Sequence, residues 1–157
     1  MFSVSSNKGG LLISNRIDQA QQFLDAADGP VHWIHVGTSA ASHRTAVFLR
    51  AQDRAQELDS AKLFGPRRED FRHKYLQFLA DLNQHNHSMA WWSLSTSTKD
   101  PNTSTMAWDV AAFLLIVDLL SGDYPNLLVV SDSRHLADQA IDWAKKKGFR
   151  ANSDVLS

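Results

Sequence analysis

The chain has 157 residues, with 16 Lys and Arg against 17 Asp and Glu, and it contains no cysteine. This length fits one domain, and the balanced charge excludes a bulk field that would draw the protein onto nucleic acid or an anionic membrane. The lack of cysteine excludes disulfides and thiolate metal sites and fits a reducing compartment, so we expect a cytoplasmic protein.

Hydrophobic spacing and turn residues predict alternating helices and strands. The run "NLLVVSD" at 126–132 is uninterrupted and apolar, which is typical of a parallel strand covered on both faces. The longest apolar stretch, 110–120, covers only about half of a membrane span and contains Asp118, so it predicts a buried helix. In the first half of the chain, we expect a helix over 16–27 with Asn15 as its N-cap, a strand at 31–36, a helix over 44–64 and a helix over 68–83. In the second half, we expect a strand at 88–94, a helix from Asp100–Pro101 to Ser121–Gly122, a strand at 126–131 and a helix that ends at Gly148.

This order of elements predicts an α/β fold, a single three-layer Rossmann-like domain over residues 1–157. We expect a small parallel sheet with helices on both faces, in which the three predicted strands are adjacent. The tail after residue 149 begins like another strand but stops before it completes one.

A polar segment follows each predicted strand, at 37–43, 95–102 and 131–135. In an open parallel sheet the functional loops collect at the carboxyl ends of the strands. The second segment runs into the predicted helix start at Asp100–Pro101, where free N–H groups and the helix dipole favour an anion. We expect Lys99 to hold a carboxylate or phosphate there. The candidate substrate-binding residues are Thr38, Ser39, His43, Trp91, Trp92, Thr98, Lys99, Asp132 and Ser133.

The same residue types have a simpler explanation. Ser, Thr and Asp at strand-to-helix turns commonly only cap helices, and tryptophans commonly fill a core. The two interpretations differ in whether the side chains face a shared cleft.

Two quoted stretches together resemble a known family. "MAWWSLSTSTKDPNTSTMAWDVAAFLLIVDLL" and the later "VVSDSRHLADQAIDWAKKKG" are similar to the N-terminal part of bacterial surface-carbohydrate biosynthesis proteins of the GT-B glycosyltransferase type, including relatives of Kdo transferases. In that group a Trp-Trp pair precedes Lys-(Asn or Asp)-Pro and a helix. The resemblance covers roughly residues 30–148. The matching positions are Trp91, Trp92, Lys99, Pro101, Ser104, Asp132, Leu136 and Gly148.

The resemblance implies that this chain corresponds to the acceptor-side lobe of a two-lobed enzyme, whose other lobe holds most of the nucleotide-sugar donor. The chain would then be a fragment, a separately encoded lobe or a reduced relative, and inactive in isolation. The implied ligand is an acidic sugar or glycan acceptor, and the implied partner is a donor-binding lobe or subunit. The catalytic residue stays unassigned.

Two alternatives from other classes remain open. Asp132 at a strand end suits a small metal-dependent nuclease or phosphatase, although such sites need further carboxylates, and a helix cap explains Asp132 as well. The other alternative is a non-catalytic module that binds a sugar or an anion. His32, His35, His85 and His87 lack a third ligand at a spacing typical of zinc, so we expect no metal. The sequence has no phosphate loop and no G-x-G-x-x-G motif, so we expect no cofactor.

Overall fold

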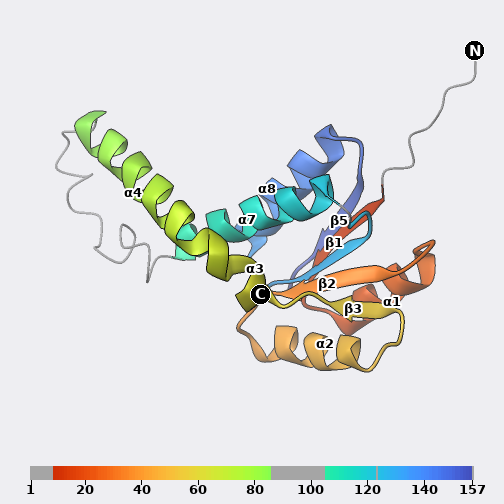
Figure 1. Ribbon diagram of the computed structural model, residues 1–157. Coiled ribbons are helices and arrows are strands. Elements are labelled where there is room, and N and C mark those ends of the chain that lie inside the picture. The colour runs from red at the N-terminus through yellow and green to blue at the C-terminus, as the bar shows by residue number, and fades with distance from the viewer. Residues whose placement is uncertain (1–8, 86–104, 123, 157) are drawn as a thin grey trace, which may run out of the picture.

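A five-stranded parallel sheet between two layers of helices forms the centre of the protein in a computed structural model (Figure 1). The structure describes residues 9–85, 105–122 and 124–156. The strand order is β3-β2-β4-β1-β5. The strands are β1 (Gly10–Ser14), β2 (Val31–His35), β3 (Ala55–Glu57), β4 (Leu127–Val130) and β5 (Arg150–Asp154). The predicted three-layer α/β fold is therefore confirmed.

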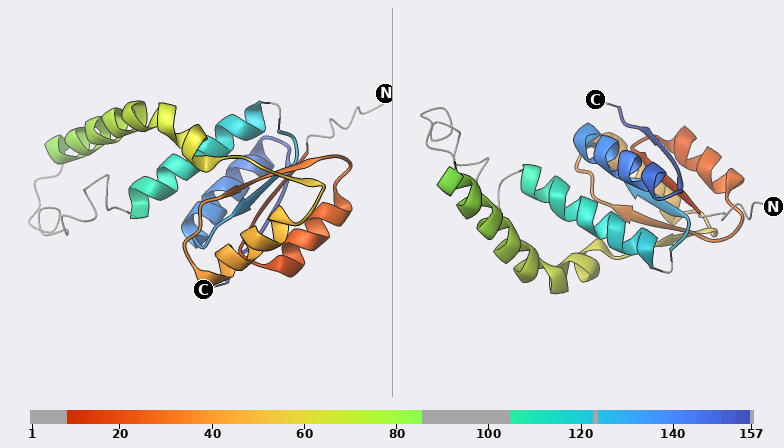
Figure 2. Two further views of the ribbon diagram at one scale, coloured as in Figure 1. Left: turned by 60° about the horizontal axis from the view of Figure 1, so that its bottom comes forward. Right: turned by 90° about the horizontal axis from the view of Figure 1, so that it is seen from above.

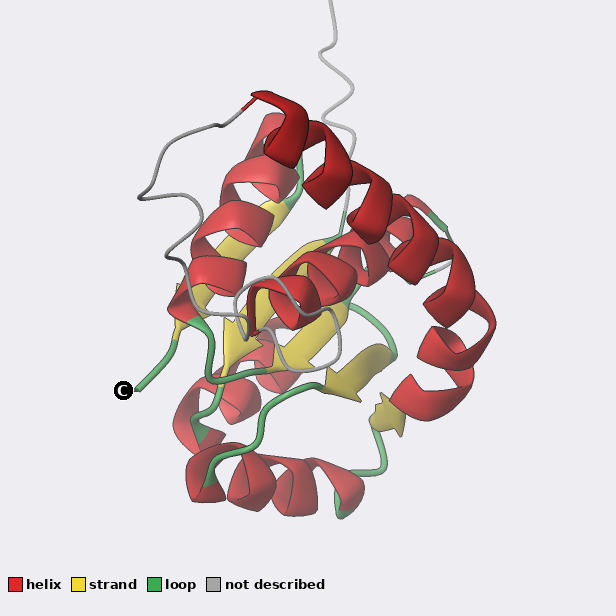
Figure 3. Ribbon diagram, turned by 90° about the vertical axis from the view of Figure 1, so that its left-hand side faces the viewer, coloured by secondary structure: helices red, strands yellow, loops and turns green. Residues whose placement is uncertain are grey.

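Each face of the sheet carries its own helices (Figures 2 and 3). One face is covered by α1 (Ile17–Ala26) and α2 (Ala40–Arg50), and the other by α7 (Thr105–Ser121) and α8 (Arg134–Lys146). Between β3 and α7 the chain forms α3 (Ser60–Phe64), a short 3-10 turn, η1 (Gly65–Arg67), and α4 (Arg68–His85). Figure 1 shows α4 projecting away from the sheet.

The core consists of two clusters because neighbouring side chains of a strand point to opposite faces. In β1, Leu12 packs with α1 and α2, whereas Leu11 and Ile13 pack with α7 and α8. The strand β4 is fully buried, and its residues divide between the two clusters in the same way. This burial on both faces explains why residues 127–130 are all apolar.

The strand-to-helix connections after β2 and β4 leave the sheet toward opposite faces. From β2 the chain passes into α2 on one face, and from the adjacent β4 it passes into α8 on the other face. Loops that leave neighbouring parallel strands toward opposite faces leave a crevice at the carboxyl edge of the sheet. The loops after β2 and β4 therefore frame the region where a ligand site is expected.

The predicted strands at 31–36 and 126–131 are confirmed as adjacent and parallel. The single helix predicted over 44–64 is wrong, because α2 ends at Arg50 and β3 pairs with β2 before α3 begins. The side chain of Asp59 caps α3 by accepting from the N–H groups of Ala61 and Lys62. The predicted strand at 88–94 lies outside the described residues.

The first and last strands along the chain, β1 and β5, were not indicated clearly by the sequence. The strand β1 lies between β4 and β5, and its residues 11–13 are buried among apolar neighbours. The tail after residue 149 completes the strand β5, which pairs with β1 from Gly10↔Arg150 to Ser14↔Asp154. The expectation that this strand stays incomplete is therefore wrong.

Candidate functional site

The loops after β2 and β4 meet at the carboxyl edge of the sheet, where this topology leads us to expect a crevice. The N–H groups of Val36 and Gly37 both donate to the carbonyl oxygen of Val130, at 2.9 and 3.0 Å, so the two loops stay joined beyond the strands. Residue 37 must be small here. A Cβ atom on Gly37 would lie 2.6 Å from the Cβ and Oγ atoms of Ser42 and 2.7 Å from Oδ2 of Asp132.

The carboxylate of Asp132 is the centre of the hydrogen bonds that join these loops. Its Oδ2 atom accepts from the N–H groups of Thr38 at 2.8 Å and Ser39 at 2.9 Å. Its Oδ1 atom accepts from the Ser39 hydroxyl and from the Asn15 side-chain amide, the latter at 3.0 Å. Burial alone would raise the pKa of Asp132, but these four hydrogen bonds together lower the pKa to about 2. The group is therefore a fixed anion at neutral pH.

This carboxylate occupies the N-terminus of α2. Ser39 is the N-cap, and its hydroxyl accepts from the N–H of Ser42 at 3.1 Å. The hydroxyl of the buried Ser42 donates in turn to the carbonyl of Ser39 at 2.9 Å. Helix N-termini attract anions through free N–H groups and the helix dipole. At α2 the anion comes from the protein itself, so the N–H groups of Thr38 and Ser39 are already engaged.

Asn15 brings a third strand into the same network. Its side-chain amide donates to Asp132 and also to the carbonyl of Leu156, and its Oδ1 atom accepts from the N–H of Leu156 at 2.9 Å. The N-cap of α1 is Arg16, which makes no side-chain capping bond. The predicted capping role of Asn15 is therefore wrong. Its buried side chain instead joins the ends of β1, β4 and the residues after β5.

Ser133 starts α8 and contacts α7. Its hydroxyl accepts from the N–H of Leu136 at 3.1 Å, as an N-cap does, and donates to Oδ2 of Asp109 at 2.8 Å. Asp109 was missed by the sequence analysis because it lies within a largely apolar helix. The only hint in the sequence was that Asp109 is the single charged residue in the otherwise apolar run "MAWDVAAF".

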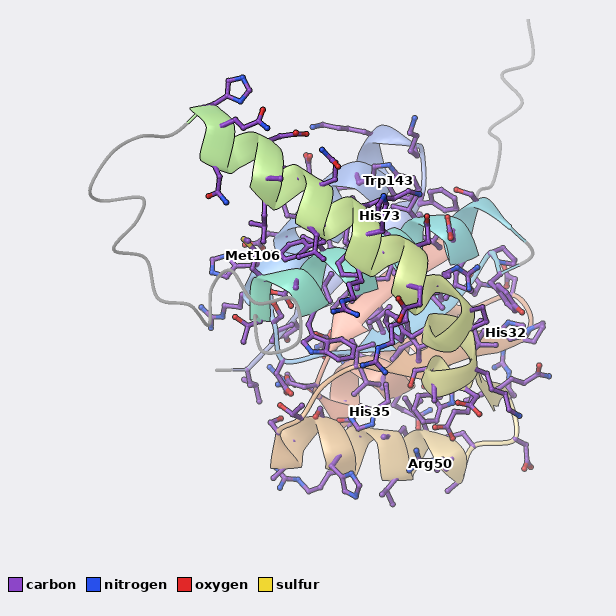
Figure 4. The ribbon with its side chains drawn as sticks, turned by 60° about the vertical axis from the view of Figure 1, so that its left-hand side comes forward. His32, His35, Arg50, His73, Met106 and Trp143 are labelled. Carbon is purple, nitrogen blue, oxygen red and sulfur yellow. The ribbon has the colours of Figure 1, made fainter. Side chains whose placement is uncertain are left out.

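Two histidines lie beside the network. The half-buried His35 is labelled in Figure 4. Its Nε2 atom is 3.4 Å from the Ser42 hydroxyl oxygen, and its ring is 6.3 Å from the ring of His43. Burial lowers the pKa of His35, and the charges of Arg50 and His43 lower it further. His35 is consequently neutral at pH 7, whereas the exposed His43 is open to solvent.

The structure brings together part of the predicted site. Thr38, Ser39 and Asp132 meet directly, Ser133 follows Asp132, and His43 lies one turn into α2. The remaining predicted residues are Trp91, Trp92, Thr98 and Lys99, which lie outside the described residues, as does the helix start predicted at Asp100–Pro101.

The described ranges contain no group of three or more His, Asp or Glu residues placed to hold a metal ion. In the same ranges no helix is both long enough and apolar enough to cross a membrane. Comparison with protein-family models, curated proteins and solved structures finds no match to this chain.

Proposed function

We propose that this chain is a glycan-binding α/β domain that acts as the acceptor-side lobe of a GT-B-type glycosyltransferase in bacterial surface polysaccharide biosynthesis. Transfer then requires a donor-binding lobe or subunit. The observation that carries the proposal is the Asp132 network, whose hydrogen bonds join the loops after β2 and β4 and the end of β1 into one polar surface at the carboxyl edge. A pre-organised polar site loses less entropy when it binds a hydroxyl-rich ligand.

The chemistry of Asp132 favours binding over catalysis in the isolated chain. A general base works best with a pKa near the operating pH. Hydrogen bonds hold the pKa of Asp132 at about 2, and its oxygens already accept four donors. This carboxylate is thus a weak base with little capacity left for a substrate proton. The same engagement disfavours the metal-dependent nuclease or phosphatase, which needs Asp132 as a free ligand.

An acidic sugar fits the charges around the crevice. The exposed Arg44 of α2 and the exposed Arg134 at the start of α8 carry positive charge, and the exposed His43 and His135 adjoin them in the chain. Cationic side chains beside a polar crevice recognise a sugar carboxylate through charge-assisted hydrogen bonds. Lys99 remains a further candidate from the sequence alone.

Two measurements on the purified chain test the proposal. Calorimetric titration with Kdo or another acidic monosaccharide should show binding that Arg44→Ala weakens about tenfold, as expected for loss of one charged hydrogen bond. Lys145→Ala is the matched control, because Lys145 is an exposed cation at the opposite end of α8. Lys99→Ala tests the residue expected from the sequence.

The second measurement is incubation of the chain with a CMP- or UDP-linked sugar and an acceptor glycan, followed by mass spectrometry of the acceptor. We expect no transfer by the chain alone. Sugar transfer would contradict the need for a donor-binding partner, and equal binding of the acidic sugar by Arg44→Ala, Lys99→Ala and wild type would contradict the recognition of its carboxylate.

A further inference from the structure

A concave surface lies away from the carboxyl edge, between α7 and the arm formed by α3, η1 and α4. The views in Figure 2 place α4 beside α7, on the side away from the sheet. The cleft between them has a volume of about 620 Å³. Its apolar lining consists of Ala61, Phe64, Phe71, Ala107, Trp108, Ala111, Leu114 and Leu115.

Large apolar side chains in this cleft are open to solvent. Trp108 is 58% exposed and Leu114 is 46% exposed, whereas Leu115 beside them is buried. The Trp108 ring meets Phe64 edge-on, with centroids 5.9 Å apart. Exposed apolar surface gathered in a hollow marks a binding site more often than scattered surface residues do.

The rim of the cleft is basic, and two of its arginine side chains have no ion-pair partner among the described residues. Arg67 pairs with Asp118 at 3.3 Å and Lys74 pairs with Asp70 at 2.8 Å. The side chains of Arg68 and Arg72, one helical turn apart on α4, make no ion pair or hydrogen bond within the described ranges. A guanidinium group binds a carboxylate or phosphate through two parallel hydrogen bonds. The cleft therefore has an apolar trough beside two uncompensated anion-binding groups.

The volume of the cleft favours a small-molecule ligand. A volume of about 620 Å³ lies within the range of small-molecule sites, roughly 300–1,000 Å³, which are mainly apolar with a few polar groups. A stable protein interface instead needs about 800 Å² from each partner, usually over a flatter surface. These features favour a small amphiphile over a protein partner.

We propose that the cleft between α4 and α7 binds a single-chain lipid with an anionic headgroup. The alkyl chain lies along α7 in the trough beside Trp108 and Leu114, and the phosphate or carboxylate contacts Arg68 and Arg72. This site is separate from the Asp132 crevice, and the inference does not depend on the proposed glycan binding.

Calorimetric titration of the full chain with dodecyl phosphate, below the concentration at which it forms micelles, tests the inference. We expect one binding site per chain. Replacing both arginines (Arg68→Ala with Arg72→Ala) should weaken binding more than tenfold, because two charged contacts are lost. The matched control is Lys145→Ala with Arg150→Ala, which removes two exposed positive charges elsewhere and should leave binding unchanged. Leu114→Glu should abolish binding by placing a like charge in the trough.

Further results distinguish the alternatives. Inorganic phosphate alone and dodecyl maltoside should each bind much more weakly than dodecyl phosphate, since each lacks one half of the recognised chemistry. The inference is overturned by equal binding of the double arginine variant and wild type, or by equally tight binding of dodecyltrimethylammonium. Absence of dodecyl phosphate binding overturns it too. Binding of an acidic amphipathic peptide in place of dodecyl phosphate would identify a protein-docking surface instead.

Folding of the variants is checked by circular dichroism and thermal midpoint. If the alanine pair unfolds, Arg68→Gln with Arg72→Gln keeps the length and helix propensity of the side chains and removes only the charge. The amide NMR signals of Thr38 and Ser39 should not shift with dodecyl phosphate, which separates this site from the carboxyl-edge crevice.

Discussion

The backbone N–H of Ser39 and the Oδ2 atom of Asp132 lie 2.9 Å apart, although 93 positions separate the two residues in the chain. Through this bond the loop after β4 supplies the anion for the N-terminus of α2. The contact stabilises the helix start and sets the shape of the crevice at the same time. Changes to this pair should therefore affect both folding stability and ligand binding.

Acid should weaken the fold through Asp132. The pKa of Asp132 is about 2 in the folded chain and about 3.9 in an unfolded one. Because the folded-state pKa is depressed, the stabilisation is complete above about pH 4 and is lost as the pH falls through about 2. Asp132→Asn should lower the free energy of unfolding at pH 7 by about 1.5–3 kcal/mol and reduce its change between pH 4 and 2. Urea unfolding at several pH values measures both quantities, and an unchanged pH dependence in Asp132→Asn would contradict the assignment.

A methyl group at residue 37 should strain the crevice. Gly37→Ala places a Cβ atom 2.6 Å from Ser42 and 2.7 Å from Asp132, so the loop must shift and the Asp132 bonds must lengthen. We expect a loss of about 1–3 kcal/mol in the free energy of unfolding, as for other overpacked sites. Gly65→Ala is the control, because nothing lies within 4 Å of its added Cβ and its backbone is helical. Equal thermal midpoints for the two variants would show that the contact at residue 37 is not tight.

His35 should titrate below its ordinary range. Burial is the main reason for the lowered pKa, and the charge of Arg50 is the next. Because the folded chain takes up a proton less readily than the unfolded one, His35 adds stability at higher pH that is lost as the pH falls below about 6.5. Arg50→Ala should raise the pKa of His35, and Arg54→Ala should not. NMR titration of the imidazole signals measures the shift, and an unchanged His35 pKa in Arg50→Ala would contradict this electrostatic contribution.

Local sequence patterns were sufficient to predict most of the layers. The apolar run in β4 and the alternation in β2 indicated the two strands that frame the crevice, and helical spacing indicated α1, α4 and α8. The three residues of β3 carry no comparable pattern, because they form an edge strand with two exposed side chains, and their pairing with β2 is a tertiary effect.

The candidate site was predictable only as a set of loops. The rule that loops gather at the carboxyl edge correctly brought Thr38, Ser39 and Asp132 together. Which groups bond to Asp132 depends on the strand order, and β1, which places Asn15 there, was not predicted as a strand. Asp109 reaches Ser133 through the packing of α7 on α8, which no local pattern encodes.

We propose that the region around Asp132 binds a glycan. The most direct test of this proposal is a ¹H–¹⁵N NMR titration of the chain with an acidic sugar, using glucose at the same concentration as the neutral comparison. We predict saturable shifts of the amide signals of Thr38, Ser39, His43 and Ser133, larger for the acidic sugar, with little change in α4. Shifts confined to α4 and α7, or no saturable shifts at all, would contradict the claim.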